Sequence, residues 1–159
     1  MLPRLRRFAY GLTGSVDSGD DLVQSACERA LTRLHQWEPG TRLDSWMFRI
    51  MKNLWLDDNR AGWRREVATS SEVLEAVRGG DAEAESAARL ELGSVLAQID
   101  RLPEAQRTVL LLVSVEGLSY KEAAAVLDVP IGTVMSRLAR ARLTLGRAIE
   151  PGEPEATQA

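Results

Sequence analysis

The side chains best suited to chemistry in this 159-residue sequence are arginines that gather in two stretches. Residues 60–65 hold Arg60, Arg64 and Arg65 and no acid. A second stretch, over residues 137–147, contains no acid and holds Arg137, Arg140, Arg142 and Arg147. Guanidinium groups bind phosphate and can read guanine through paired hydrogen bonds, so both stretches suit contact with a nucleic acid.

Charge is distributed unevenly around these stretches. The formal net charge is −3, which argues against a protein that simply coats DNA. Between the two basic stretches, the charged residues of 66–91 are seven acids and two arginines. Because local charge decides where a polyanion docks, two basic patches separated by an acidic segment predict localised nucleic-acid contacts.

Catalytic chemistry finds little support in the sequence. Cys27 and His35 are the only residues of their types, so no internal disulfide and no metal site of ordinary spacing can form. Cys27 lies in an apolar helical pattern, which favours a buried structural role. Gly132 and Thr133 stand at a predicted helix start but lack the lysine of a phosphate-binding loop. We therefore expect no enzyme, no metal and no cofactor.

The elements that must position these side chains are predicted to be helices throughout, since the alternating pattern of strands is absent. A first helix spans about residues 3–12. Ser18 is expected to cap a second helix, with Asp20 and Asp21 in its first turn. A third helix should start near Asp44 or Ser45. Three apolar series give the predicted inward faces: Val23, Cys27, Ala30, Leu34, Trp37; Leu22, Ala26, Leu31; and Trp46, Ile50, Met51, Leu54.

We predict an all-α protein, and the composition divides its chain into two small domains. We predict a first domain over residues 1–65, a flexible acidic linker over 66–81, a second domain over 82–149 and a disordered tail over 150–159. In the second domain, Leu90, Val95, Leu96 and Ile99 predict one helix. Pro103 is expected as the first residue of the next helix.

Residues 119–142 form a candidate helix-turn-helix. The predicted helix after Pro103 ends at Gly117, and Ser119 with Glu122 fits a capping box at the next helix start. Val134 and Leu138 lie four residues apart and should face the core. The outward positions are Thr133, Met135, Ser136, Arg137 and Arg140, which suit base edges and phosphates. The competing interpretation is a helical hairpin with a solvated basic face.

Three motifs in this order resemble a known family. Residues 20–24 read Asp-Asp-Leu-Val-Gln, residues 46–53 read Trp-Met-Phe-Arg-Ile-Met-Lys-Asn, and residues 117–142 contain the helix-turn-helix. Together they are similar to the extracytoplasmic-function sigma factors of the sigma-70 family, with region 2 and region 4 domains. The resemblance covers about residues 2–65 and 90–148. It implies promoter recognition and transcription initiation with RNA polymerase, in a stress response under anti-sigma control.

The resemblance also assigns a protein-binding row. Asp21 and Gln24 would contact the clamp coiled coil of core RNA polymerase, with Glu28 one turn further along the same face. An exposed row of carboxylates and an amide can pair with arginines of a partner helix. The other implied partners are promoter DNA and an anti-sigma factor.

For the minus-10 element, the resemblance implies capture of the non-template strand by the third helix and its preceding loop. Asn53 matches the position near the captured base. The residues assigned to this contact are Arg42, Asp44, Arg49, Lys52, Asn53, Arg60 and Arg64. Trp46 is expected in the core, whereas Trp55 and Trp63 could stack on DNA. Asp57 and Asp58 place negative charge near this surface.

For the minus-35 element, the resemblance implies major-groove reading by the last helix. The residues assigned are Thr133, Met135, Ser136, Arg137, Arg140 and Arg142. Met135 stands where many members carry a basic residue, and Ala139 is small where some use a bulky contact, so base choice there should differ.

Two alternatives remain. A sigma-like decoy would sequester an anti-sigma factor, and a standalone helix-turn-helix regulator would use only the second domain. No stretch approaches the roughly 18 apolar residues that a membrane helix needs, and the basic N-terminus runs into no long apolar region. We therefore expect a cytoplasmic protein without membrane insertion.

Overall fold

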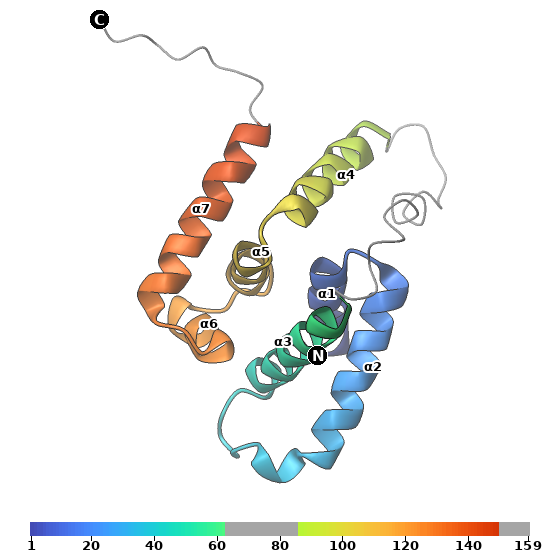
Figure 1. Ribbon diagram of the computed structural model, residues 1–159, viewed down its shortest axis with the longest axis vertical. Coiled ribbons are helices and arrows are strands. Elements are labelled where there is room, and N and C mark those ends of the chain that lie inside the picture. The colour runs from blue at the N-terminus through green and yellow to red at the C-terminus, as the bar shows by residue number, and fades with distance from the viewer. Residues whose placement is uncertain (63–85, 150–159) are drawn as a thin grey trace, which may run out of the picture.

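The structure, a computed structural model, describes residues 1–62 and 86–149. Its elements are α1 (Leu2–Thr13), α2 (Val16–Thr32), the 3₁₀ turn η1 (Leu34–Gln36), α3 (Leu43–Gly62), α4 (Ser86–Arg101), α5 (Glu104–Leu110), the π-helical segment η2 (Leu111–Val115), α6 (Tyr120–Leu127) and α7 (Ile131–Ile149). Within the described ranges no strand occurs, which confirms the all-α prediction there. Figure 1 shows α1–α3 in one group and α4–α7 in another, and α6 packs against α3.

The start of α2 differs from the prediction. Ser15, not Ser18, caps the helix: its hydroxyl oxygen accepts a hydrogen bond of 3.3 Å from the Ser18 backbone N–H. Gly14 ends α1 in the left-handed region, at φ 71°, so the connection is short and the next residue becomes the cap. Asp20 and Asp21 consequently lie in the second turn of α2, beyond the reach of the capping amides.

The apolar stripe of α2 is buried along only part of its predicted length. Leu22, Val23, Ala26 and Ala30 are buried. Leu31 and Leu34, which the pattern assigned to the same face, are 76% and 53% exposed. Leu34 is exposed because α2 ends at Thr32 and the chain turns into η1, where the α-helical periodicity no longer applies. Leu31 still lies in the last turn of α2, at the edge of the apolar stripe and away from its centre.

A glycine brings α1 and α2 close together. A Cβ on Gly19 would lie 2.3 Å from the Cδ1 atom of Tyr10, too close for any side chain. The Tyr10 hydroxyl donates a 2.8 Å hydrogen bond to Asp20. This bond raises the pKa of Tyr10, and it directs Asp20 toward α1.

The third helix presents the predicted apolar face to the first two. Its buried residues are Met47, Phe48, Ile50, Met51 and Leu54, and Trp46 is half-buried against the same core. Phe48 meets Phe8 of α1 edge-to-face, with ring centroids 4.9 Å apart. Aromatic pairs in this geometry contribute about 0.5–1.5 kcal/mol beyond their buried area.

The second group contains the predicted helix-turn-helix. Pro103 is the N-cap of α5 and not its first residue. The single helix predicted up to Gly117 changes into a π-helical segment at Leu111. Both bonds of the capping box at Ser119 and Glu122 are present, at 3.0 and 3.1 Å. Asp128, at φ 55°, ends α6 in the left-handed region and turns the chain into α7.

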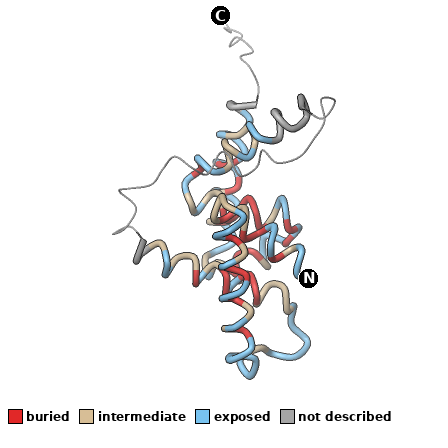
Figure 2. The backbone as a smooth tube through the Cα atoms, turned by 90° about the vertical axis from the view of Figure 1, so that its right-hand side faces the viewer, coloured by how far each residue is buried: buried red, intermediate tan, exposed pale blue. Residues whose placement is uncertain are grey.

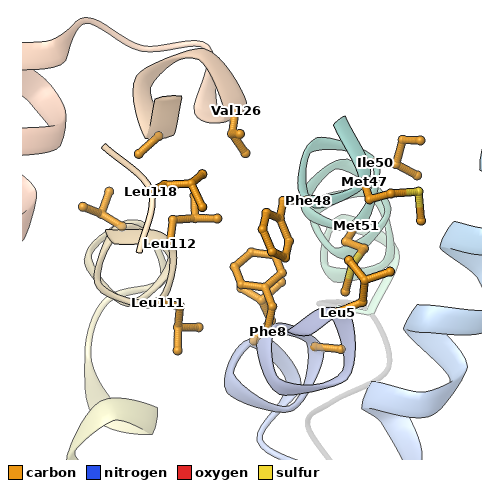
Figure 3. Packing of buried hydrophobic residues seen from close by; sticks show 14 of the residues in the cluster. Leu5, Phe8, Met47, Phe48, Ile50, Met51, Leu111, Leu112, Leu118 and Val126 are labelled. Carbon is orange, nitrogen blue, oxygen red and sulfur yellow. The ribbon is translucent and has the colours of Figure 1, made fainter. Parts of the chain in front are cut away.

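One hydrophobic core joins the two groups of helices. Figure 3 shows Phe8 and Phe48 standing between Leu111, Leu112 and Leu118 on one side and Leu5 and Met51 on the other. A Cβ on Gly11 of α1 would lie 2.6 Å from Leu111 Cδ2, so the two groups meet closely. Figure 2 shows the buried residues running as one band through the middle of the molecule.

Several sequence expectations lie outside the described residues. These are the flexible linker over 66–81, the tail over 150–159, and the roles given to Trp63 and Arg64. None of the described helices combines the length and the apolar character that a membrane crossing requires.

Candidate nucleic-acid and protein interfaces

The predicted protein-binding row lies on the outer face of α2. Asp21, Gln24 and Glu28 are exposed, because Leu22 and Ala26 turn the opposite face into the core. The Gln24 amide donates a 3.3 Å hydrogen bond to the Glu28 carboxylate, one helical turn away. The structure thus aligns all three side chains on one surface that a basic partner helix can contact.

A shallow cavity of about 250 Å³ opens beside this row, between α2 and α3. Its lining includes Asp21 and Ser25 of α2 with Trp55 and Asp58 of α3. Trp55 is half-buried here and faces two carboxylates. Such surroundings repel a polyanion, so this tryptophan is poorly placed for the stacking role considered from the sequence.

The loop before α3 is held by ion pairs. Asp44 Oδ2 lies 2.6 Å from Arg4 Nη1 and 2.7 Å from Arg42 Nη2. Burial of Asp44 by itself raises the pKa, but hydrogen bonds from Arg42, Arg4 and the Ser45 backbone outweigh it and hold the pKa at about 2. The carboxylate therefore stays charged and fixes both arginines.

Arg42 also reaches the second group of helices. Its Nη1 atom lies 2.8 Å from Glu122 Oε2 on α6. Hydrogen bonds to Asp44 and Glu122 raise the pKa of Arg42 further above its usual value. Arg42, which the sequence assigns to DNA, is thus engaged by carboxylates from both groups.

Two further residues assigned to the minus-10 strand face α6. The Arg49 guanidinium donates a hydrogen bond to the backbone carbonyl of Ala125. Burial lowers the pKa of Lys52, as does the nearby Arg49, whereas Asp128 at the end of α6 opposes the shift. Asn53 is exposed. The side chains of Arg60 and Arg64 lie outside the described residues.

The outward face of α7 is open. Met135, Ser136, Arg140 and Arg142 are exposed, whereas Thr133 and Arg137 are half-buried. Val134, Leu138 and Ala141 are buried and hold the helix against α5 and α6, as the sequence predicts for the first two. Four of the six assigned side chains are therefore exposed on this helix.

One cluster of ion pairs was not predicted from the sequence. The carboxylate of Glu116, which follows η2, is fully buried and receives guanidinium groups from both Arg4 and Arg7 of α1. These pairs are separated by 112 and 109 positions in the chain, so no local pattern could predict them. Among the described residues, no group of three histidines, cysteines or acids could hold a metal ion.

Comparison with family models finds two matches. Residues 92–145 match the family described as "Sigma-70, region 4". Residues 1–52 match the family described as "Sigma2 domain of PhyR". The two matches fall on the two groups of helices.

Similar proteins cover nearly the whole chain. The "ECF RNA polymerase sigma factor EcfG" of Rhodopseudomonas palustris is 39% identical over 148 residues, which is 91% of this chain and 78% of that protein. The sigma factor RpoE of Bartonella quintana, solved in complex with the anti-sigma factor NepR, aligns with a TM-score of 0.77 at 29% identity, over 93% of this chain and 91% of that one. The PhyRSL–NepR complex from Sphingomonas sp. Fr1 aligns with a TM-score of 0.64 at 26% identity, over 99% and 92%.

Proposed function

Since the chain is an extracytoplasmic-function sigma factor of the sigma-70 family, we propose that it binds core RNA polymerase, directs it to a promoter and helps open the DNA there, under the control of an anti-sigma factor. The observation that carries this proposal is the 39% identity to EcfG, which spans 91% of the chain and so includes both groups of helices. Sigma factors are regulatory DNA-binding proteins, and we propose that this one performs no catalysis of its own and works in the cytoplasm.

Core polymerase binding is assigned to the α2 row of Asp21, Gln24 and Glu28. The exposure of all three side chains on one face supports this assignment. Carboxylates bind arginine through charge-assisted hydrogen bonds, which are about twice as strong as neutral ones. The region 2 domain would comprise residues 1–65, with 66–81 as the linker.

Minus-10 binding is assigned to α3 and the loop before it. Opening a duplex is favoured when a flipped base is trapped and its neighbours are held by cationic side chains. Asn53 is exposed and offers an amide that can read a base edge. The phosphate contacts would come from Arg42, Arg49, Lys52, Arg60 and Arg64, with Asp44 orienting Arg42.

Minus-35 binding is assigned to α7 in the region 4 domain, residues 82–149, which the tail over 150–159 follows. Ser136 and Arg140 are exposed where a recognition helix contacts bases. Thr133, Arg137 and Arg142 would hold the phosphate backbone, and Met135 would make an apolar contact. The basic and acid-free character of residues 137–147 supports binding to a polyanion.

One observation favours a second candidate, a decoy that sequesters an anti-sigma factor. Residues 1–52 match the sigma-like domain of PhyR, and the Bartonella quintana PhyR is described as an anti-anti-sigma factor. The exposed basic face of α7 weighs against this candidate, because a decoy has no need to read DNA.

Run-off transcription with core polymerase and a promoter library separates the two candidates. We expect binding to core and transcripts with defined start sites. The variant Asp21→Ala with Gln24→Ala should weaken core binding, whereas Asp57→Ala, which removes an exposed carboxylate of α3, should leave it unchanged. Binding to an anti-sigma factor without binding to core would support the decoy and reject the sigma function.

A further inference from the structure

We propose that Met135 reads the 5-methyl group of a thymine, so that this chain selects a T·A pair beside the base pairs that Ser136 and Arg140 contact. The inference rests on the proposed function and deepens it, because it names the base that one side chain of α7 takes in the minus-35 element. The contact is apolar and requires no charge on the protein.

The outward face of α7 lies at the edge of the second group of helices (Figure 1). The exposed residues of 132–140 are Gly132, Met135, Ser136, Ala139 and Arg140. With about 3.6 residues per turn, Met135 and Arg140 lie on opposite flanks of this face, and the other three lie between them. The opposite side of the helix is buried against α5 and α6. The face therefore carries two long side chains, of which one is apolar and the other cationic.

The middle of this face is occupied by small residues. A Cβ placed on Gly132 would meet nothing within 4 Å, and Ala139 carries a single methyl group. The major groove of DNA is about 12 Å wide and admits one helix, so short central side chains let the helix backbone approach the base edges. The longer side chains of Met135 and Arg140 can then reach the base pairs on either side.

Met135 belongs to an apolar patch that folding leaves uncovered. It is 51% exposed, and Ile131, one turn earlier, is 44% exposed. Neither side chain packs against the hydrophobic core of the described residues. Since residues four positions apart are neighbours on a helix, the two form one patch at the start of α7. A partner that covers this patch removes apolar surface from water, which is favourable.

The chemistry of the major groove identifies what can cover Met135. The edges of guanine, adenine and cytosine present hydrogen-bond donors and acceptors there, and the 5-methyl of thymine is the one apolar group. A methionine side chain has no donor, and its thioether sulfur is only a weak acceptor. Its unbranched chain adapts to an irregular apolar surface. Thymine is therefore the base that Met135 favours.

Arg142 lies two turns beyond Met135 on the same flank of α7 and is exposed. Phosphate contacts fix the register of a protein on DNA, whereas contacts to base edges select the sequence. A phosphate held by Arg142 would thus fix the position at which Met135 meets a base. The flank combines one residue suited to the backbone with one suited to a methyl group.

The test removes the methyl group from the DNA and the methionine from the protein. Duplexes are selected from a random pool by the full-length chain, with and without core polymerase, so the test does not depend on transcription. Each thymine of the selected element, on either strand, is then replaced by deoxyuridine, which lacks only the 5-methyl group. Fluorescence anisotropy should show one thymine whose replacement weakens binding about fourfold, the effect of one buried group of this size.

The Met135→Ala variant should bind the thymine and deoxyuridine duplexes equally well, because the side chain that meets the methyl group is gone. Met135→Leu should keep the preference, since leucine is also apolar and of similar size. The matched control is Leu96→Ala, which removes a side chain of α4 that is 44% exposed and should leave the fourfold difference intact.

A cytosine at the same position provides an independent measurement. Binding should weaken with cytosine and recover in part with 5-methylcytosine, which restores the methyl group but not the oxygen of thymine. Met135→Ala should abolish this recovery as well.

Three results would overturn the proposal: no enriched sequence in either pool, no thymine sensitive to deoxyuridine, or a methyl effect that persists in Met135→Ala. Transcripts with defined start sites but no methyl effect would reject the Met135 contact alone. A methyl effect in a chain that gives no run-off transcripts would reject the proposed function alone.

Discussion

Asp44 has a structural role that its assignment to the DNA surface does not describe. The family resemblance assigns Asp44 to the DNA surface, where a carboxylate would repel phosphate. In the structure it accepts hydrogen bonds from Arg4 and Arg42 and so fixes the loop before α3. Its contribution at the residue scale is to orient two cations.

The variant Asp44→Asn should change the pH dependence of stability. The folded state holds the pKa of this carboxyl at about 2, against its usual 3.8. Because the unfolded state takes up the proton first, the stabilisation is complete above about pH 4 and is lost as the pH falls toward 2. The free energy of unfolding is measured by urea denaturation at pH values between 2 and 4, and its slope against pH should be weaker for Asp44→Asn than for the wild type. At neutral pH the variant should be about 1–3 kcal/mol less stable. Asp57→Asn is the control, and an unaltered slope in Asp44→Asn would contradict the assignment.

Arg140→Ala should weaken binding to a minus-35 duplex by about 1–3 kcal/mol if the guanidinium reads a base through two hydrogen bonds. The exposed position of Arg140 on α7 leaves it available for that contact. Anisotropy with duplexes taken from the transcribed promoters measures the loss, and Arg101→Ala, on α4, serves as control. An equal loss on scrambled duplexes would identify a phosphate contact instead.

At the scale of elements, close helix contacts and caps decide where the functional faces point. Gly19 lets α1 approach α2 on one side, and the row of Asp21, Gln24 and Glu28 is exposed. The capping box at Ser119 starts α6 at a fixed residue, and Asp128 ends it in a left-handed turn. The cap at Ser119 and the turn at Asp128 fix the two ends of α6, and the turn directs the chain into α7.

Gly19→Ala should destabilise the protein although alanine favours helices. The added Cβ would lie 2.3 Å from Tyr10 Cδ1, and overpacking of this kind costs about 1–3 kcal/mol. Gly93→Ala is the matched control, since it is also helical but has open space around it. That control should gain about 0.5–1 kcal/mol. Equal midpoints for the two variants in thermal denaturation would refute the close contact.

Ser119→Ala should destabilise α6 by about 0.5–2 kcal/mol, because the Glu122 backbone N–H loses its 3.1 Å acceptor. Ser94→Ala, at an exposed position of α4, should leave stability unchanged or slightly higher. Chemical denaturation of both variants measures the difference. A neutral Ser119→Ala would mean that water replaces the cap without loss.

At the scale of the whole molecule, the two groups of helices share one core. Phe8 and Phe48 of the first group belong to the same buried cluster as Leu112 and Leu138 of the second. A continuous core couples the unfolding of the parts that it joins. The surface that is free for partners therefore depends on how the two groups of helices pack together, and not on either group alone.

The wild-type chain should consequently unfold in one calorimetric transition at low salt, with equal calorimetric and van 't Hoff enthalpies. Gly11→Gln should split this transition in two, because the added side chain meets Leu111 and separates the groups without changing the core of either. Gly93→Gln should keep the single transition. Two transitions in the wild type would show that the shared core contributes little to cooperativity.

The sequence by itself determined the local features of this protein. Helical periodicity and the capping box at Ser119 depend on residues within a few positions of one another, so they can be read from a short window. The family motifs likewise assigned the proposed partner contacts to α2, α3 and α7. The Ser18 cap was misplaced by three residues, because a left-handed Gly14 shortened the connection.

Only the tertiary structure decided which of the predicted cations are available. Arg42 and Arg49 are exposed in the structure, yet the guanidinium group of each donates a hydrogen bond to α6. The pairing of Arg4 and Arg7 with Glu116 crosses more than a hundred positions and has no local signature. Such contacts depend on how two apolar faces bring remote charges together, and burial then makes their pairing obligatory.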